Sequence, residues 1–99
     1  MVSKRRVLVT GASGLIGGLV IKNLGDKYEF SALNRRPIEG IASIQADISN
    51  FDSIHPAFDG IHTVLHLGAL ATPGLTNNWD GIASTNIYGT FNVYEASRI

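Results

Sequence analysis

The sequence predicts a small α/β fold that forms the first part of a doubly wound parallel sheet. Short apolar runs without polar alternation recur along the chain, which is typical of strands covered on both faces. Segments with helical spacing lie between these runs, and a glycine-rich turn separates the first run from the first such segment. Because strands that alternate with helices form parallel sheets through right-handed crossovers, we expect about four strands with intervening helices.

Length and composition predict a single domain over residues 1–99, since 99 residues with 44% apolar side chains hold one core. The eight basic side chains balance the eight acidic ones, so we expect no nucleic-acid partner. The absence of cysteine excludes thiol chemistry and agrees with a cytoplasmic location. No apolar stretch reaches the roughly 18 residues of a membrane span, so no membrane partner is expected either.

The first strand is expected at Val7 to Val9, followed by a turn at Gly11. Gly25 stands where a left-handed C-terminal cap would end the next helix. That helix is predicted from apolar residues at helical spacing, namely Leu15, Ile16, Leu19, Val20 and Leu24. Two further strands are expected at Tyr28 to Leu33 and Ser43 to Ala46.

Elements are less regular in the second half of the chain. A short helix from Ser49 to Phe58, capped by Ser49, precedes a turn at Asp59-Gly60 and a fourth strand from His62 to Leu67. A final helix is predicted from one stripe of residues, namely Trp79, Ile82, Ala83, Asn86, Ile87, Thr90, Val93 and Tyr94. Its aromatic residues, Trp79, Phe91 and Tyr94, are interpreted as core rather than as a base-stacking platform.

The most informative motif is Gly11-Ala-Ser-Gly14-Leu-Ile-Gly17, between the first strand and the first helix. A phosphate-binding turn needs glycine where the backbone reverses, where a side chain would meet the pyrophosphate, and where the helix presses on the strand. The helix N-terminus then offers unpaired N–H groups to the phosphates, and the Ser13 hydroxyl can join them. The alternative is an ordinary strand-to-helix turn whose small residues allow close packing.

The end of the second strand indicates which dinucleotide would bind. An acidic residue at this place binds the ribose 2'-hydroxyl of NAD, but the sequence has Asn34 followed by Arg35 and Arg36. Guanidinium groups pair with a 2'-phosphate, so NADP is favoured over NAD. The alternative is a solvated basic loop.

Four segments together resemble the extended short-chain dehydrogenase/reductase family, also called the NAD-dependent epimerase/dehydratase family. They are TGASGLIG at Thr10 to Gly17, ADI at Ala46 to Ile48, VLHLGALA at Val64 to Ala71 and NIYGTFNVYEAS at Asn86 to Ser97. The resemblance implies a Rossmann-type fold and an NAD(P) cofactor. It also implies that Asp47 contacts the adenine amino group, Ile48 its ring, and Leu67, Gly68 and Ala69 the path toward the pyrophosphate.

The expected cofactor site therefore consists of Gly11, Ser13, Gly14, Leu15, Ile16, Gly17, Asn34, Arg35, Arg36, Asp47, Ile48, Leu67, Gly68 and Ala69. Two assignments have plain structural alternatives. Asp47 is equally suited to form a turn or a helix cap ahead of Ser49. Asn86 resembles a helix asparagine that supports the active-site backbone, but a buried asparagine bonded to a nearby carbonyl would look the same.

No metal site is expected. His62 and His66 are four residues apart, which would suit a metal on a helix, but on a strand that spacing separates them by roughly 13 Å. Sequence order also offers no persuasive Ser-His-Asp triad.

No catalytic residue is expected in this chain. The family that it resembles transfers protons with a tyrosine followed by a lysine four residues later, whereas Tyr28, Tyr88 and Tyr94 are followed at that spacing by Ala32, Asn92 and Arg98. We therefore expect a cofactor domain that stops before the catalytic region. It would serve an oxidoreductase or a sugar-nucleotide epimerase/dehydratase that acts on a small molecule such as a sugar, and it would tend to self-associate. The alternative is a noncatalytic NADP-binding redox sensor or scaffold.

Overall fold

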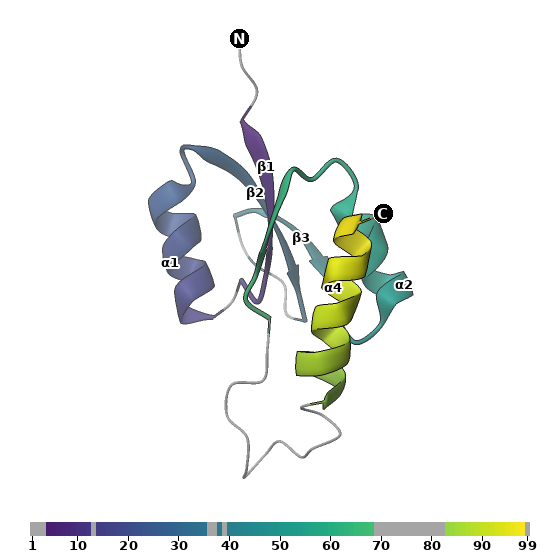
Figure 1. Cartoon of the computed structure of the whole chain (residues 1–99). Helices are drawn as coiled ribbons and strands as arrows, with labels where there is room; N and C mark the ends of the chain where they lie inside the picture. The colour runs from purple at the N-terminus through teal and green to yellow at the C-terminus, as the bar shows by residue number, and fades with distance from the viewer. Residues whose placement is uncertain (1–3, 13, 36–37, 39, 69–82, 99) are drawn as a thin grey trace.

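The computed structural model describes residues 4–12, 14–35, 38, 40–68 and 83–98 (Figure 1). Its centre is a four-stranded parallel sheet with the strand order β3-β2-β1-β4. The strands are β1 (Arg5–Thr10), β2 (Tyr28–Asn34), β3 (Ala42–Gln45) and β4 (Thr63–His66). The helices are α1 (Leu15–Leu24), α2 (Phe51–Ile54), the 3-10 helix η1 (His55–Phe58), the π-helix η2 (Ala83–Tyr88) and α4 (Gly89–Arg98).

The strand order confirms the predicted fold class. From β1 the chain moves outward to β2 and β3, and it then crosses back to place β4 on the other side of β1. This reversal is the topological switch of a doubly wound, Rossmann-type sheet. All four predicted strands are present within two residues of their expected ends. The first is longer than its apolar run because parallel pairing to β2 begins at Arg5 and pairing to β4 continues to Thr10.

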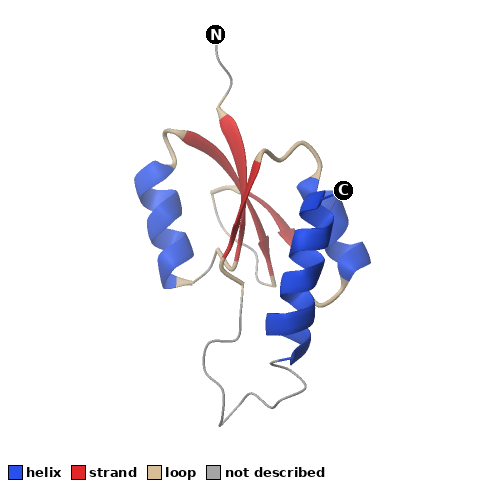
Figure 2. Cartoon of the chain, in the orientation of Figure 1, coloured by secondary structure: helices blue, strands red, loops and turns tan. Residues whose placement is uncertain are grey.

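Helices cover the sheet on both faces (Figures 1 and 2). Because alternate residues of a strand point to opposite faces, Val7 and Val9 of β1 pack toward α1, whereas Leu8 packs toward α2, η1 and α4. Burial on both faces explains why β1 has apolar residues without alternation.

Two predictions about helix ends are wrong. Gly25 follows α1 with φ −61°, in the right-handed region, and no left-handed cap forms there. A Cβ at this position would lie 2.8 Å from the Ile21 carbonyl oxygen, so close approach rather than positive φ explains the glycine. The short helix is capped by Asn50, whose side chain accepts a hydrogen bond from the Ser53 backbone N–H, and not by Ser49. The turn at Gly60 is confirmed, with φ +73°.

The interpretation of the last helix as core is wrong for its described aromatic residues. Phe91 is 62% exposed and Tyr94 is 71% exposed, and Ile87 of the predicted stripe is also exposed. The reason is that α4 contacts the sheet layer through its small residues Gly89 and Ala96 together with Val93, so the bulkier side chains point outward. Trp79 lies outside the described residues.

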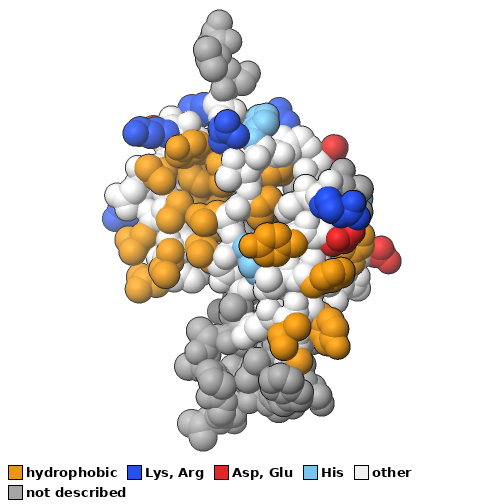
Figure 3. Space-filling model, in the orientation of Figure 1, with side chains coloured by type: hydrophobic (Ala, Val, Ile, Leu, Met, Phe, Trp, Pro, Cys, Tyr) orange, Lys and Arg blue, Asp and Glu red, His pale blue; other side chains and the backbone are white. Residues whose placement is uncertain are grey.

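Apolar side chains are also exposed on α1. Leu15, Ile16 and Leu19 are all at least half exposed, and the space-filling view shows apolar surface over this helix (Figure 3). Among the described residues, no helix combines the length and apolar character that crossing a membrane requires.

Candidate functional site

A cavity of about 520 Å³ lies at the carboxyl ends of the strands, where the chain crosses from one side of β1 to the other. Ligands of open α/β sheets bind at this switch point. The loops after all four strands contribute to the walls, and so do the first turn of α1 and Thr85 of η2. The lining residues are Gly11, Gly14, Leu15, Ile16, Gly17, Leu33, Asn34, Arg35, Ala46, Asp47, Ile48, Leu67, Gly68 and Thr85.

Gly11 begins the glycine turn with φ +70°, a conformation that side-chain-bearing residues rarely adopt. A Cβ on Gly11 would lie 2.8 Å from the Leu67 carbonyl and from the Gly68 backbone nitrogen. The turn after β1 and the loop after β4 therefore approach each other so closely that only glycine fits.

Gly17 and Gly14 serve different purposes in the same motif. A Cβ on Gly17 would lie 2.9 Å from the Ala12 Cα and the Gly11 carbonyl oxygen, so this glycine lets α1 press against the turn. Gly14 is the N-cap of α1 with φ −75°, and a Cβ there would meet, among the described atoms, only the Gly11 carbonyl oxygen at 3.4 Å. Packing does not require glycine at position 14, and no side chain caps the helix.

The first turn of an α-helix leaves N–H groups without partners inside the helix, and its N-terminus carries partial positive charge. Gly14 provides no capping side chain for these groups, and this same end of α1 lines the cavity through Gly14, Leu15 and Ile16. The arrangement suits an anion, and the cavity fits the phosphate-binding turn that the glycine spacing predicts.

Asn34 and Arg35 line the cavity where β2 ends. The Asn34 carbonyl accepts a hydrogen bond from the Ala46 N–H at 3.0 Å, which joins this end of β2 to the chain after β3. The side chain of Arg35 is exposed and carries its positive charge at the rim of the cavity. Arg36 lies outside the described residues.

Asp47 and Ile48 form the wall that follows β3. One Asp47 carboxylate oxygen accepts the Ser49 backbone N–H at 2.9 Å, so the turn-forming role foreseen as an alternative is present while the residue also lines the cavity. Ile48 is buried against α4, where a Cβ on Gly89 would lie 2.6 Å from its Cγ1. The Asn92 side chain donates to the Ile48 carbonyl at 2.9 Å and fixes the same loop.

All described residues of the expected cofactor site therefore line one cavity, whereas Ser13, Arg36 and Ala69 lie outside the described residues. The expectation omitted Thr85, because the sequence gives no sign that the helix begins with π-helical winding. It also omitted Thr10, which is fully buried and accepts the Leu67 and Gly68 N–H groups on its hydroxyl oxygen at 3.0 and 2.9 Å. A polar residue directly after the apolar run Val7 to Val9 was the available signal.

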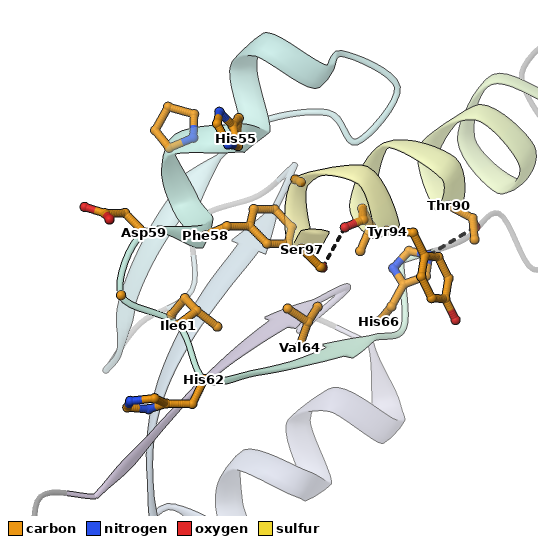
Figure 4. A pocket seen from close by; sticks show the side chains of 14 residues that line it. His55, Phe58, Asp59, Ile61, His62, Val64, His66, Thr90, Tyr94 and Ser97 are labelled. Carbon is orange, nitrogen blue, oxygen red and sulfur yellow. Dashed lines mark hydrogen bonds between the residues drawn. The ribbon is translucent and has the colours of Figure 1, made fainter. Parts of the chain in front are cut away.

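A larger groove of about 1060 Å³ follows the exposed edge of β4, between η1 and α4 (Figure 4). Side chains of these three elements line it, including His66, together with His62 and the rest of the turn before β4, and the glycine turn does not contribute. The groove is therefore separate from the glycine turn. Among the described residues, no three side chains are grouped as metal ligands.

The sheet order and the glycine turn at the switch point define an α/β domain of the dinucleotide-binding class. The sequence profile of the NAD-dependent epimerase/dehydratase family matches residues 7–99, and the chain belongs to this family. This agrees with the resemblance carried by the four sequence segments.

Several similar proteins are dehydrogenases. L-arabinose 1-dehydrogenase (NAD(P)(+)) of Haloferax volcanii is 36% identical over 92 residues, which are 93% of this chain and 35% of that protein. NAD-dependent glucose-6-phosphate dehydrogenase of the same organism is 31% identical over 92% of this chain and 37% of its own length. A uronate dehydrogenase variant from Agrobacterium tumefaciens, complexed with NAD, has a TM-score of 0.82 and 26% identity over 97% of this chain and 37% of its own. The chain thus spans about a third of the length of these relatives.

Proposed function

We propose that this chain is the dinucleotide-binding part of an NAD(P)-dependent oxidoreductase. The observation that carries the proposal is the cavity at the switch point, where the uncapped N-terminus of α1 meets the turn at Gly11. The absence of a packing reason for glycine at position 14 supports a ligand close to that backbone. When it is bound, the nicotinamide cofactor supplies hydride transfer, and the residues of this chain bind and orient it.

The proposed contacts follow the walls of the cavity. The backbone from Gly14 to Ile16 would receive the pyrophosphate, the end of β2 with Arg35 would receive the adenosine ribose, and Asp47 with Ile48 would flank the adenine. Leu67 and Gly68 would line the path from the adenosine to the phosphates. No group for proton transfer is assigned to this chain, because its tyrosines lack a lysine four residues later.

We propose a sugar or sugar derivative as the substrate of the whole protein. Support comes from the relatives, whose names include an arabinose, a glucose 6-phosphate and a uronate dehydrogenase. The test is calorimetric titration of the full-length gene product with NAD and NADP, followed by absorbance assays of cofactor reduction with a panel of aldoses and uronates. A folded protein that binds neither dinucleotide would refute the proposal. A protein that binds but reduces no cofactor with any substrate would favour the noncatalytic sensor.

The basic residues after β2 predict a preference for NADP. Replacing both Arg35 and Arg36 with alanine is expected to weaken NADP binding by about one to two powers of ten and to leave NAD binding nearly unchanged. The reason is that the loss of one charge-assisted hydrogen bond to the 2'-phosphate costs roughly 1.5 to 3 kcal/mol. The measurement is the dissociation constant of each dinucleotide for both proteins. A parent protein that prefers NAD, or a variant that loses both cofactors equally, would contradict this prediction.

A further inference from the structure

His66, the last residue of β4, has a hydrogen-bond partner at both ring nitrogens. Its Nδ1 lies 2.6 Å from the hydroxyl oxygen of Thr10 on β1, and its Nε2 lies 3.1 Å from the hydroxyl oxygen of Thr90 on α4. Figure 4 shows the ring projecting from β4 toward Thr90, with Tyr94 alongside. The ring is partly buried, and it bridges the strand that precedes the glycine turn to the last helix.

The partners of these hydroxyl groups determine where the ring carries its proton. The Thr10 oxygen already accepts the Leu67 and Gly68 N–H groups, so its own hydrogen is available for Nδ1 of His66. The Thr90 hydroxyl donates to the Asn86 carbonyl at 2.7 Å, so its oxygen accepts from Nε2. Both requirements are met only by the neutral ring with its hydrogen on Nε2.

This chain of hydrogen bonds connects the parts of the proposed cofactor site. Thr10 immediately precedes Gly11, and its hydroxyl holds the backbone of Leu67 and Gly68, which line the cavity. The same loops are in close contact where Gly11 faces Gly68. The orientation of one threonine hydroxyl therefore joins the turn after β1 to the loop after β4, and His66 fixes that orientation.

We propose that neutral His66 is a positioning residue that holds these two loops in the conformation that binds the dinucleotide, and that protonation of its ring weakens binding. The inference rests on the proposed function. A proton on Nδ1 would place two donors, the ring N–H and the Thr10 O–H, against each other at the Nδ1···Oγ1 contact. The hydroxyl must then turn away, and its oxygen must accept a third N–H, which disturbs the hold on Leu67 and Gly68.

The surroundings favour the neutral ring. Burial lowers the pKa of His66 below its ordinary value of 6.5. It faces Thr10 from β1 and Thr90 from α4. The titratable side chains that share its groove are Tyr94 on α4, His62 just before β4, His55 at the start of η1 and Asp59 just after η1. Because the folded pKa lies below that of the unfolded chain, the contribution of His66 to stability is complete above pH 6.5 and is lost progressively as the pH falls below it.

The test is the dissociation constant for NAD of the full-length gene product between pH 5.5 and 8, measured by calorimetry. NAD is chosen because it lacks the 2'-phosphate, and phosphate monoesters titrate near pH 6. We expect constant affinity at high pH and a loss that approaches about tenfold per pH unit once His66 becomes protonated.

Three variants separate positioning from other effects. His66→Asn keeps an acceptor for the Thr10 hydroxyl but does not titrate, so it should bind nearly as well as the parent at pH 8 and show no loss on acidification. His66→Phe removes the acceptor and should bind about tenfold more weakly at every pH. His62→Asn is the matched control, because His62 directly precedes β4, where its Nδ1 accepts the Arg6 backbone N–H away from the cavity, and the variant should retain the parent profile.

The position of the proton on the His66 ring can be measured directly. Long-range proton–nitrogen NMR spectra of the full-length protein should give the Nε2–H tautomer for His66 and a pKa below 6.5. Four results would each overturn this inference without touching the proposed function. They are an affinity that is independent of pH, an affinity that rises on acidification, a His66→Asn profile like that of the parent, and an Nδ1–H tautomer. A folded protein that fails to bind NAD at any pH would remove the proposed function and this inference together.

Discussion

Replacing Gly14 with aspartate is expected to lower the dinucleotide affinity of the full-length gene product by about a hundredfold or more while the fold is retained. Gly14 is exposed with an ordinary φ of −75°, and a Cβ there meets the Gly11 carbonyl oxygen at 3.4 Å, which is ordinary contact. The cost would fall on the ligand, since two like charges about 4 Å apart repel by roughly 4 kcal/mol at an effective dielectric constant near 20. Calorimetry measures the affinity, and circular dichroism checks the fold.

Gly18→Asp is the matched control for this substitution. It adds the same charge to α1 four residues further on, at an exposed position that does not line the cavity and where a Cβ meets no described atom within 4 Å. We expect its affinity to change only a few-fold, because solvent screens an exposed charge. A folded Gly14→Asp variant with the parent affinity would remove the glycine turn from the proposed site.

Gly17 and Gly18 are neighbours in α1. We expect replacement of each by alanine to have opposite effects on the free energy of unfolding. A Cβ on Gly17 would lie 2.9 Å from two backbone atoms, so Gly17→Ala should lower the free energy of unfolding by about 1 to 3 kcal/mol. A Cβ on Gly18 meets no described atom, so Gly18→Ala should raise that free energy by up to about 1 kcal/mol, because alanine is the better helix former.

Urea denaturation monitored by circular dichroism measures the free energy of unfolding of both variants. The opposite signs are the essential feature, because a general effect of alanine in a helix would move both midpoints in the same direction. Equal stabilisation by both substitutions would mean that α1 does not press on the turn at Gly11 and Ala12.

The sheet could be predicted from the sequence because its signals are local. Continuous apolar residues at Val7 to Val9 reflect burial on both faces, and the glycine spacing after them reflects a turn with positive φ and a close helix. Arg35 was expected in the site from its place at the end of the second strand, and Asp47 from the family resemblance, and the cavity contains both.

The remaining features depend on contacts between distant segments. Periodicity places Phe91 and Tyr94 on a helix, but which face is buried depends on how α4 lies against the sheet. His66 was weighed only as a partner of His62, since its hydrogen bonds join it to Thr10 and Thr90, which are 56 and 24 residues away. Such pairings follow from the fold, and a linear pattern does not reveal them.

The most direct test of the proposed function is a crystal structure of the full-length gene product with a bound nicotinamide dinucleotide. We predict that the pyrophosphate lies within hydrogen-bond distance of the backbone N–H groups between Gly14 and Ile16, with the adenine beside Asp47 and Ile48. A dinucleotide bound elsewhere, such as in the groove along β4, with the switch-point cavity left unoccupied by the ligand, would contradict the account.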